Sequence, residues 1–168
     1  MELFEAIAAR ASVRELQAAE VSEDDLERIL DAGRRAPSGR NRQPIEFIVV
    51  RDPDTIEKLA KAQACIADVS LLIAVAADPE KSEFWLEDIA AATENMLLAI
   101  TGLGYASVWI EGTLLPDEEQ HKQLLGVPDR LRLMVALPVG RPAKAPKQAD
   151  KRPLEEMVHW ERFGNLRR

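Results

Sequence analysis

Apolar residues in the first part of the chain recur at helical spacing. Residues 3–10 are rich in apolar and helix-forming side chains, and Leu26, Ile29 and Leu30 share one helix face after Ser22. Serine is a preferred N-cap residue, and the acidic residues just after it suit the positive end of a helix dipole. The pattern therefore predicts two helices, one over residues 3–10 and one that begins after Ser22.

Unbroken apolar runs predict the strands. Ile45–Val50 and residues 131–139 are mostly apolar, and Leu71–Ala77 is apolar at every position. A run of that length without polar interruption is typical of a strand that is covered on both faces. Residues 105–110 predict one further strand.

The helix predicted over residues 82–103 is apolar on most of its faces, so more than one neighbour must cover it. Shorter helices are predicted to open at Asp52-Pro53, with proline in the first turn, and to cover residues 116–125. Helices thus alternate with strands, and we expect a mixed α/β sandwich of about four or five strands with helices on both faces. A parallel dinucleotide-binding sheet is not expected, because no Gly-x-Gly-x-x-Gly follows a strand.

The last part of the chain has a different character. Pro142, Pro146 and Pro153 interrupt it, and apolar residues return only at intervals after Leu154. Such a segment is either a disordered end or an arm that wraps a partner. With no internal repeat, we expect one domain over residues 1–168, of which about 141–168 form a C-terminal arm.

Composition narrows the classes of function. The chain has 168 residues, 46% hydrophobic and 30% charged, with a formal net charge of −7. This acidity argues against a nucleic-acid binder and against attachment to anionic membranes. Leu71–Ala77 is far shorter than the roughly 20 residues of a membrane helix. The N-terminus does not resemble a signal peptide, and the single cysteine, Cys65, forms no intrachain disulfide, so we expect a cytoplasmic protein.

Three side chains just after the first helix are candidates for anion binding. Arg10, Ser12 and Arg14 place two guanidinium groups and a hydroxyl within five residues, which suits a phosphate or carboxylate clamp. The alternative is that these basic residues only complement the negative end of the helix dipole.

Two further segments contain candidate ligand-binding groups. The 37–44 loop places Ser38, Asn41 and Gln43 beside Gly39, and these donors and acceptors suit a planar heterocycle, although an ordinary turn would use the same residue types. At the end of the predicted 105–110 strand, Trp109 is expected to pack in the core. The next two residues, Glu111 and Gly112, stand where α/β proteins often place a site.

The order and spacing of four segments make a stronger case than any one of them. They are Arg-x-Ser-x-Arg at 10–14, the 36–44 loop that continues into Ile45–Val50, residues 88–99 followed by 102–104 and 109–112, and residues 151–159. In this order they resemble the nitroreductase-like flavoproteins over nearly the whole chain, to about Trp160. The resemblance implies a central mixed, mainly antiparallel sheet flanked by helices.

The resemblance also implies a homodimer that holds FMN at its interface. Arg10 and Arg152 are expected to meet the flavin phosphate, with Ser12 nearby and Lys151 as a second cation. Arg14 is expected to reach toward the ribityl chain or the pyrimidine edge, where a cation stabilises the negative charge of reduced flavin.

The other expected flavin contacts come from two loops. The 37–44 loop is expected to reach the ring from the partner subunit, and the backbone at Glu111 and Gly112 is expected to address the N5 and O4 edge. Gln63 and Lys61 are nearby candidates for the pyrimidine. The residues expected from the loop are Pro37, Ser38, Gly39, Asn41 and Gln43.

Such an enzyme takes hydride from NADH or NADPH at flavin N5 and passes it to a nitroaromatic, a quinone or a similar acceptor by a ping-pong mechanism. It requires no protein nucleophile, general acid or metal. His121 is accordingly expected at the surface, and Phe84 and Trp85 are expected either to line the acceptor pocket or to pack the central helix. Alternatives are reductive dehalogenation, flavin breakdown, a flavin-binding module without turnover, and an unrelated phosphate-ligand module.

Overall fold

The structure is a computed structural model that describes residues 1–166. Within them, the helices are α1 (Leu3–Ala9), α2 (Glu23–Arg34), α3 (Pro53–Leu59), α4 (Trp85–Gly102) and α5 (Glu118–Leu125). The strands are β1 (Leu16–Gln17), β2 (Ile45–Val50), β3 (Leu71–Ala77), β4 (Arg132–Val139) and β5 (Arg141–Pro142). Short 3-10 turns lie at Gly39–Asn41, Ala64–Asp68, Leu115–Asp117 and Leu154–Glu156.

The central sheet is antiparallel, in the order β2-β3-β4. Ile45 of β2 lies opposite Ala77, and Leu71 lies opposite Val139 of β4. Every residue of β3 is buried, as its unbroken apolar run predicts. β1 and β5 form a separate antiparallel pair.

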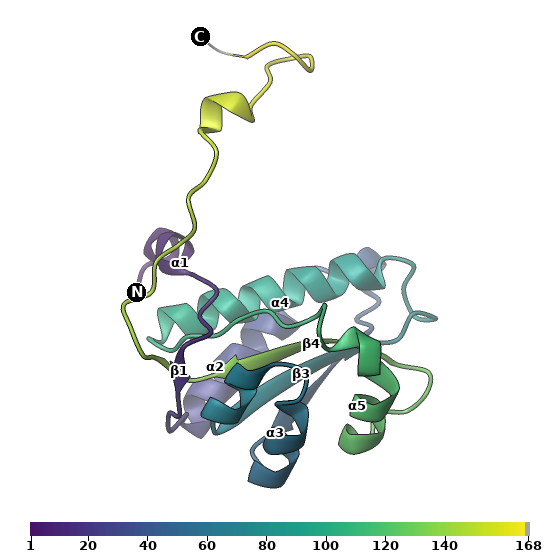
Figure 1. Cartoon of the computed structure of the whole chain (residues 1–168). Helices are drawn as coiled ribbons and strands as arrows, with labels where there is room; N and C mark the ends of the chain where they lie inside the picture. Colours follow the sequence, from purple (N-terminus) through teal and green to yellow (C-terminus); the bar gives the residue numbers. More distant parts are fainter. Residues whose placement is uncertain (167–168) are drawn as a thin grey trace.

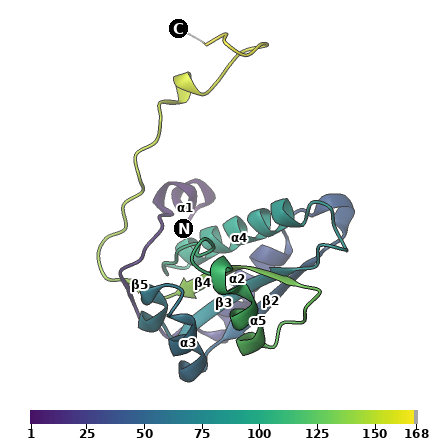
Figure 2. The same ribbon diagram turned by 45° about the vertical axis from the view of Figure 1, so that its right-hand side comes forward.

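Helices cover both faces of the sheet, which confirms the predicted sandwich (Figure 2). Alternate side chains of β3 point to opposite faces. Leu71, Ile73 and Val75 pack in one apolar cluster with residues of α2 and α4. Leu72 and Ala74 pack in a second cluster with residues of α3 and α5.

The prediction of a regular strand over residues 105–110 is wrong. The segment exchanges backbone hydrogen bonds with the end of β4 at two points, Ala106 with Gly140 and Ile110 with Ala136. In this register Val108 stands opposite Pro138, and proline has no N–H to donate to a ladder. The ladder is therefore interrupted at Pro138, and the segment forms isolated bridges.

The expected helix caps are present. Ser22 Oγ accepts a hydrogen bond from the backbone N–H of Asp25 at 3.1 Å, and α3 begins with Pro53 after the N-cap Asp52. Cys65 is a free, buried cysteine. The expectation of a surface position for His121 is wrong: its ring is buried, and Nδ1 lies 3.1 Å from the carbonyl oxygen of Leu114. It is buried because α5 packs this side against the turn that precedes it.

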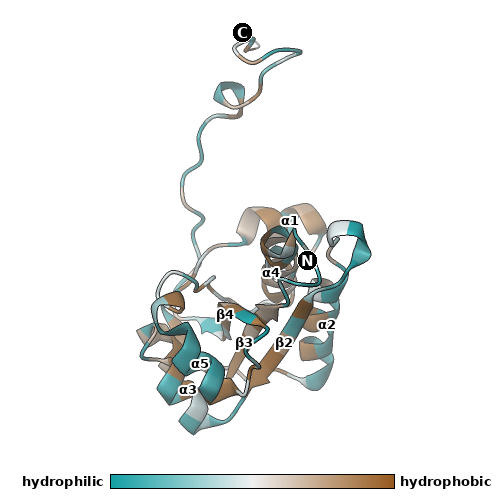
Figure 3. Ribbon diagram, turned by 90° about the vertical axis from the view of Figure 1, so that its right-hand side faces the viewer, coloured by the Kyte–Doolittle hydropathy of each residue, from teal (hydrophilic) through white to brown (hydrophobic). Residues whose placement is uncertain are grey.

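The chain leaves the body of the protein after β5 (Figure 1). Gln148 Nε2 donates hydrogen bonds to the carbonyls of Ile7 and Arg10, at 3.2 and 3.0 Å. Beyond this point the chain extends away from the sheet and its helices, and brown apolar segments alternate with teal polar ones along it (Figure 3). Leu154 is 72% exposed and Phe163 is 92% exposed. In the part of the chain described, no helix is long and apolar enough to cross a membrane.

Candidate functional site

The 10–14 segment is fastened along the interrupted edge of the sheet. Val13 donates its N–H to the carbonyl of Ser107 at 2.9 Å, and Ser12 forms a parallel bridge with Ser107. Arg10 Nε lies 3.4 Å from Glu94 Oε1 of α4. The side chains of Ser12 and Arg14 are exposed, so two of the three expected clamp residues are available to a ligand.

A groove of about 270 Å³ runs beside this segment. Residues 11–15 form one wall and residues 144–147 form the other. Its basic side chains are Arg14, Lys144 and Lys147, and Lys144 Nζ pairs with Glu15 Oε2 at 2.6 Å. The local surface is thus rich in cations although the chain as a whole is acidic, and it suits an anionic ligand.

A second segment, at 63–65, lies near this one, because β1, which follows the 10–14 segment, contacts the 3-10 turn Ala64–Asp68. Burial raises the pKa of the Cys65 thiol, and the positive charge of Arg14 acts in the opposite direction. Two residues before Cys65, Gln63 Oε1 accepts a hydrogen bond from Thr113 Oγ1 at 3.3 Å. Through Ser107 and Thr113, the stretch at 107–113 contacts both the 10–14 segment and the 63–65 segment, so three segments far apart in the sequence lie together on this surface.

The expected ring-edge residues lie on this surface. Trp109 Nε1 donates to Glu111 Oε2 at 2.9 Å, so the carboxylate is turned back toward the indole. Trp109 itself packs against the first apolar cluster, as expected. At Gly112 a Cβ atom would meet no atom within 4 Å. The backbone beside Glu111 therefore borders open space, as close approach of a planar ligand requires.

The 37–44 loop is hydrogen-bonded to a different part of α4. Gly39 donates its N–H to Asp88 Oδ1 at 2.8 Å, whereas Arg10 meets Glu94, which is about 9 Å farther along the helix at 1.5 Å per residue. No hydrogen bond or ion pair joins the loop to the 10–14 segment among the described residues. The loop and the 10–14 segment are therefore held at separate positions along α4.

The arm holds the expected phosphate residues Lys151 and Arg152. Both are exposed, and Arg152 Nη2 donates to the carbonyl of its neighbour Glu156 at 3.2 Å. Among the described residues Arg152 pairs with Glu156 and Arg10 pairs with Glu94, and no hydrogen bond or ion pair joins the two arginines.

Phe84 and Trp85 have different surroundings. Trp85 packs against the first apolar cluster, and the Arg132 guanidinium lies 5.8 Å from its ring centroid. Phe84 is exposed and lies directly over Gly39, where a Cβ atom would be 2.4 Å from Phe84 Cδ2. The structure thus places Trp85 against the core, partly buried, and leaves Phe84 beside the 37–44 loop.

The sequence interpretation gave no role to three residues that order this region, Ser82, Asp88 and Thr113. Asp88 carried a signal, because it is a carboxylate in the first turn of a mostly apolar helix. The pairing of Thr113 with Gln63 carried none, since it joins two loops that only the fold brings together.

Comparison with known proteins agrees with these features. The chain matches a model of the nitroreductase family over residues 7–71 and 63–141. It is 36% identical to a protein from Archaeoglobus fulgidus that is provisionally named an NADH dehydrogenase/NAD(P)H nitroreductase, over 96% of this chain and 99% of the relative.

Solved structures show the same fold. A protein of the same provisional name from Parabacteroides distasonis superposes with a TM-score of 0.88 at 30% identity, over 96% of this chain and 98% of the other. A provisionally named nitroreductase from Desulfovibrio desulfuricans, crystallised in complex with FMN, gives a TM-score of 0.83 at 31% identity, over 97% and 98% of the two chains. The chain belongs to the nitroreductase family, which confirms the resemblance, the fold class and the expectation of an oxidoreductase.

Proposed function

We propose that the chain is an FMN-dependent NAD(P)H oxidoreductase that works as a homodimer and reduces a nitroaromatic, a quinone or a similar acceptor by a ping-pong mechanism. The observation that supports this most is the surface where the segments at 10–14, 63–65 and 111–113 meet. The FMN complex of the relative from Desulfovibrio desulfuricans supports the choice of cofactor.

The donors on this surface fit the parts of FMN. A guanidinium and a hydroxyl, at Arg14 and Ser12, suit the anionic and polyol parts of the molecule. The amide of Gln63 suits the pyrimidine edge, since it both donates and accepts. The open backbone at Gly112 allows the flat ring to approach closely.

Bound FMN would supply the redox chemistry by accepting hydride at N5 from NADH or NADPH and passing it to the acceptor. The protein's part is to bind, orient and stabilise. Arg14 would hold positive charge near the pyrimidine, where the reduced cofactor is anionic. Phe84 would present an apolar face to the acceptor beside the 37–44 loop, and no protein nucleophile is involved.

A homodimer resolves the separation of the expected contacts. Arg152 and the 37–44 loop of one chain would complete the site on the other, with Arg152 beside Arg10 at the phosphate. The exposed apolar residues of the arm, Leu154 and Phe163 among them, would then be covered by the second subunit.

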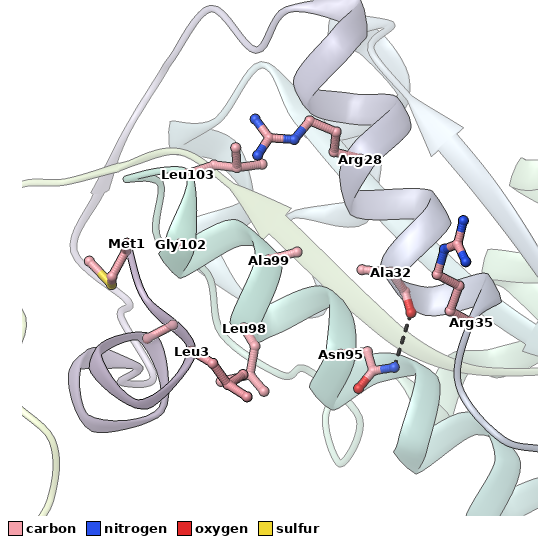
Figure 4. Close-up of a pocket in the computed structure, with 11 residues that line it drawn as sticks. Met1, Leu3, Arg28, Ala32, Arg35, Asn95, Leu98, Ala99, Gly102 and Leu103 are labelled. Carbon is pink, nitrogen blue, oxygen red and sulfur yellow. Dashed lines mark hydrogen bonds between the residues drawn. The ribbon is translucent and has the colours of Figure 1, made fainter.

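A groove on the body suits such an interface (Figure 4). It has a volume of about 520 Å³ between α1, α2 and α4, and Leu98, Leu103, Arg28 and Arg35 are among the residues that line it. Phe4 of α1 is exposed and follows Leu3, which lines the groove. It adds to the apolar surface available for contact.

The test is anaerobic titration of the purified protein. We expect a yellow protein whose chromophore bleaches with NADH or NADPH and recovers when a nitroaromatic or a quinone is added. A protein that remains colourless in excess FMN would refute the proposal. Binding without bleaching would indicate a flavin-binding module, and oxidation of substrate or loss of iodide or bromide from an aryl halide would indicate the related chemistries.

A further inference from the structure

The 37–44 loop has a backbone that its own residues do not favour. Arg40, Asn41 and Gln43 have φ angles of 51°, 57° and 48°. This left-handed region is disfavoured for side chains other than glycine and asparagine. Non-glycine residues held there persist only where their surroundings fix them, and such positions cluster at functional sites. The loop therefore needs external contacts to keep its shape.

Asp88 connects the 37–44 loop to α4 by hydrogen bonding. Its side chain is in the first turn of α4, and the residue is 3% exposed. One carboxylate oxygen accepts the N–H of Gly39 at 2.8 Å, and the other accepts the hydroxyl of Ser82 at 2.8 Å. A negative charge is also favourable at this end of the helix. Both oxygens are thus used to join two separate stretches of chain.

The hydrogen bond between Asp88 and Ser82 also connects Asp88 to Phe84. Ser82 Oγ accepts the N–H of Phe84 at 3.2 Å, so the hydroxyl is bonded on both sides. Phe84 Cδ2 would lie 2.4 Å from a Cβ atom at Gly39, which means that only glycine admits the ring at this distance. The loop, the turn at Ser82 and the Phe84 ring are therefore fixed as one unit through Asp88.

We propose that Asp88 is a positioning residue, which sets the geometry of the 37–44 loop and of Phe84 where they meet the flavin and its acceptor. This rests on the proposed function, in which the loop completes the flavin site of the second subunit. Asp88 touches neither cofactor nor acceptor; it acts through Gly39 and Ser82. Its carboxylate is suited to this because it accepts both hydrogen bonds at once.

The variants separate this role from general stability. Asp88→Ala removes both acceptors, and Asp88→Asn keeps one oxygen for Gly39 and gives an amide that can donate to Ser82. Glu118→Ala is the matched control, since Glu118 is also a shielded carboxylate in the first turn of a helix. It too accepts from a backbone N–H, that of Leu133, and from one side chain.

The first measurement needs no cofactor: hydrogen exchange of the Gly39 amide in the apo-protein. We expect exchange at least about tenfold faster in Asp88→Ala and within about threefold of wild type in Asp88→Asn, since a hydrogen bond to a charged group is lost in one and retained in the other. Glu118→Ala should leave the exchange of Gly39 unchanged. Unchanged exchange in Asp88→Ala would overturn the proposal.

The second measurement is FMN affinity together with acceptor kinetics. In Asp88→Ala we expect the Kd for FMN or the KM for the acceptor to rise about tenfold, with recovery in Asp88→Asn. An equal loss in Glu118→Ala would show a purely structural role and overturn the proposal.

If Asp88→Ala does not fold, Ser82→Ala is the variant that tests the proposal. It should raise the acceptor KM with little change in Gly39 exchange, and an unchanged KM would count against the proposal. Failure of the wild-type protein to bind FMN would instead refute the proposed function, and the exchange comparison would still decide whether Asp88 fixes the loop.

Discussion

Arg10 forms an ion pair with Glu94, with Nε and Oε1 3.4 Å apart, and this pair anchors the start of the 10–14 segment on α4. The Glu94 side chain is 49% exposed, and exposed pairs of this kind contribute about 0–1 kcal/mol. The pair is therefore too weak to commit Arg10 to a structural role. Its guanidinium keeps further donors for an anion brought to this surface.

The first prediction concerns Arg10 itself. Arg10→Ala should weaken FMN binding by about 1.5–3 kcal/mol, or roughly tenfold to hundredfold, because it removes charge-assisted hydrogen bonds to the phosphate. Equilibrium titration of flavin fluorescence measures this. Glu94→Gln is the control, since it breaks the ion pair and leaves the guanidinium in place. If Glu94→Gln weakens binding as much as Arg10→Ala, the phosphate assignment is wrong.

The second prediction concerns Arg152, which pairs with Glu156 and not with Arg10 in the described part of one chain. Arg152→Ala should reduce FMN affinity by a similar factor, and Arg162→Ala, which removes an exposed arginine farther along the arm, should not. The sharper test mixes chains with Arg10→Ala and chains with Arg152→Ala. If the two residues meet across the dimer, each mixed dimer has one site with both arginines and one with neither.

Titration of the mixed dimer should therefore show half of the sites with wild-type affinity. If Arg10 and Arg152 met within one chain, every site would lack one arginine and none would recover. The two arrangements give different titration curves from the same sample, so the experiment does not depend on the absolute affinity.

Local patterns in the sequence were sufficient for most of the fold. The all-apolar run of β3 and the broad apolar surface of α4 each report burial directly, because neither depends on knowing the partner. The interruption of the 105–110 ladder could not be predicted in this way. It depends on Pro138 standing opposite Val108, and that register exists only once the segment lies beside β4.

Some residues of the candidate site could likewise be predicted from the sequence, and others could not. Arg14 and Gly112 stand out by residue type, since a cation and a flexible backbone suit an anionic, planar ligand. Gln63 and Thr113 form their hydrogen bond only after two loops are folded together. The buried position of His121 also comes from tertiary packing, because an isolated helix with acidic neighbours shows no reason to bury a histidine.

The third prediction is a pH dependence of stability that centres on Glu118. Burial alone would raise the pKa of this carboxyl group, but the Arg132 guanidinium and the N–H of Leu133 lower it below its ordinary value of 4.5. A lowered pKa stabilises the folded state above the ordinary value, and this contribution is lost as the pH falls through the pKa of the folded state.

Glu118→Gln should accordingly lower the free energy of unfolding at pH 7 by roughly 1–2 kcal/mol. This is a modest value for the loss of hydrogen bonds to a charged group, because Arg132 is half exposed to solvent. The difference from wild type should shrink as the pH drops below 4.5. Urea unfolding at a series of pH values measures it. Glu57→Gln, an exposed carboxylate on α3, is the control and should show no such trend; a difference for Glu118→Gln that stays constant down to low pH would contradict the assignment.

The last prediction concerns the arm in the dimer. Leu154 and Met157 are exposed in the single chain, and a change of an exposed residue usually alters stability by no more than about 0.5 kcal/mol. If the second subunit covers them, Leu154→Glu or Met157→Glu would place an unpaired charge in an apolar interface, which is strongly unfavourable. We expect these variants to shift sedimentation at micromolar concentration from dimer toward monomer and to lose FMN together with the dimer.

The control is Gln123→Glu, which adds the same charge to the exposed surface of α5 and should sediment as wild type. Variants that remain dimeric and keep FMN would show that the arm does not contribute to the interface, and the partner contribution to the site would then have to come from the 37–44 loop alone.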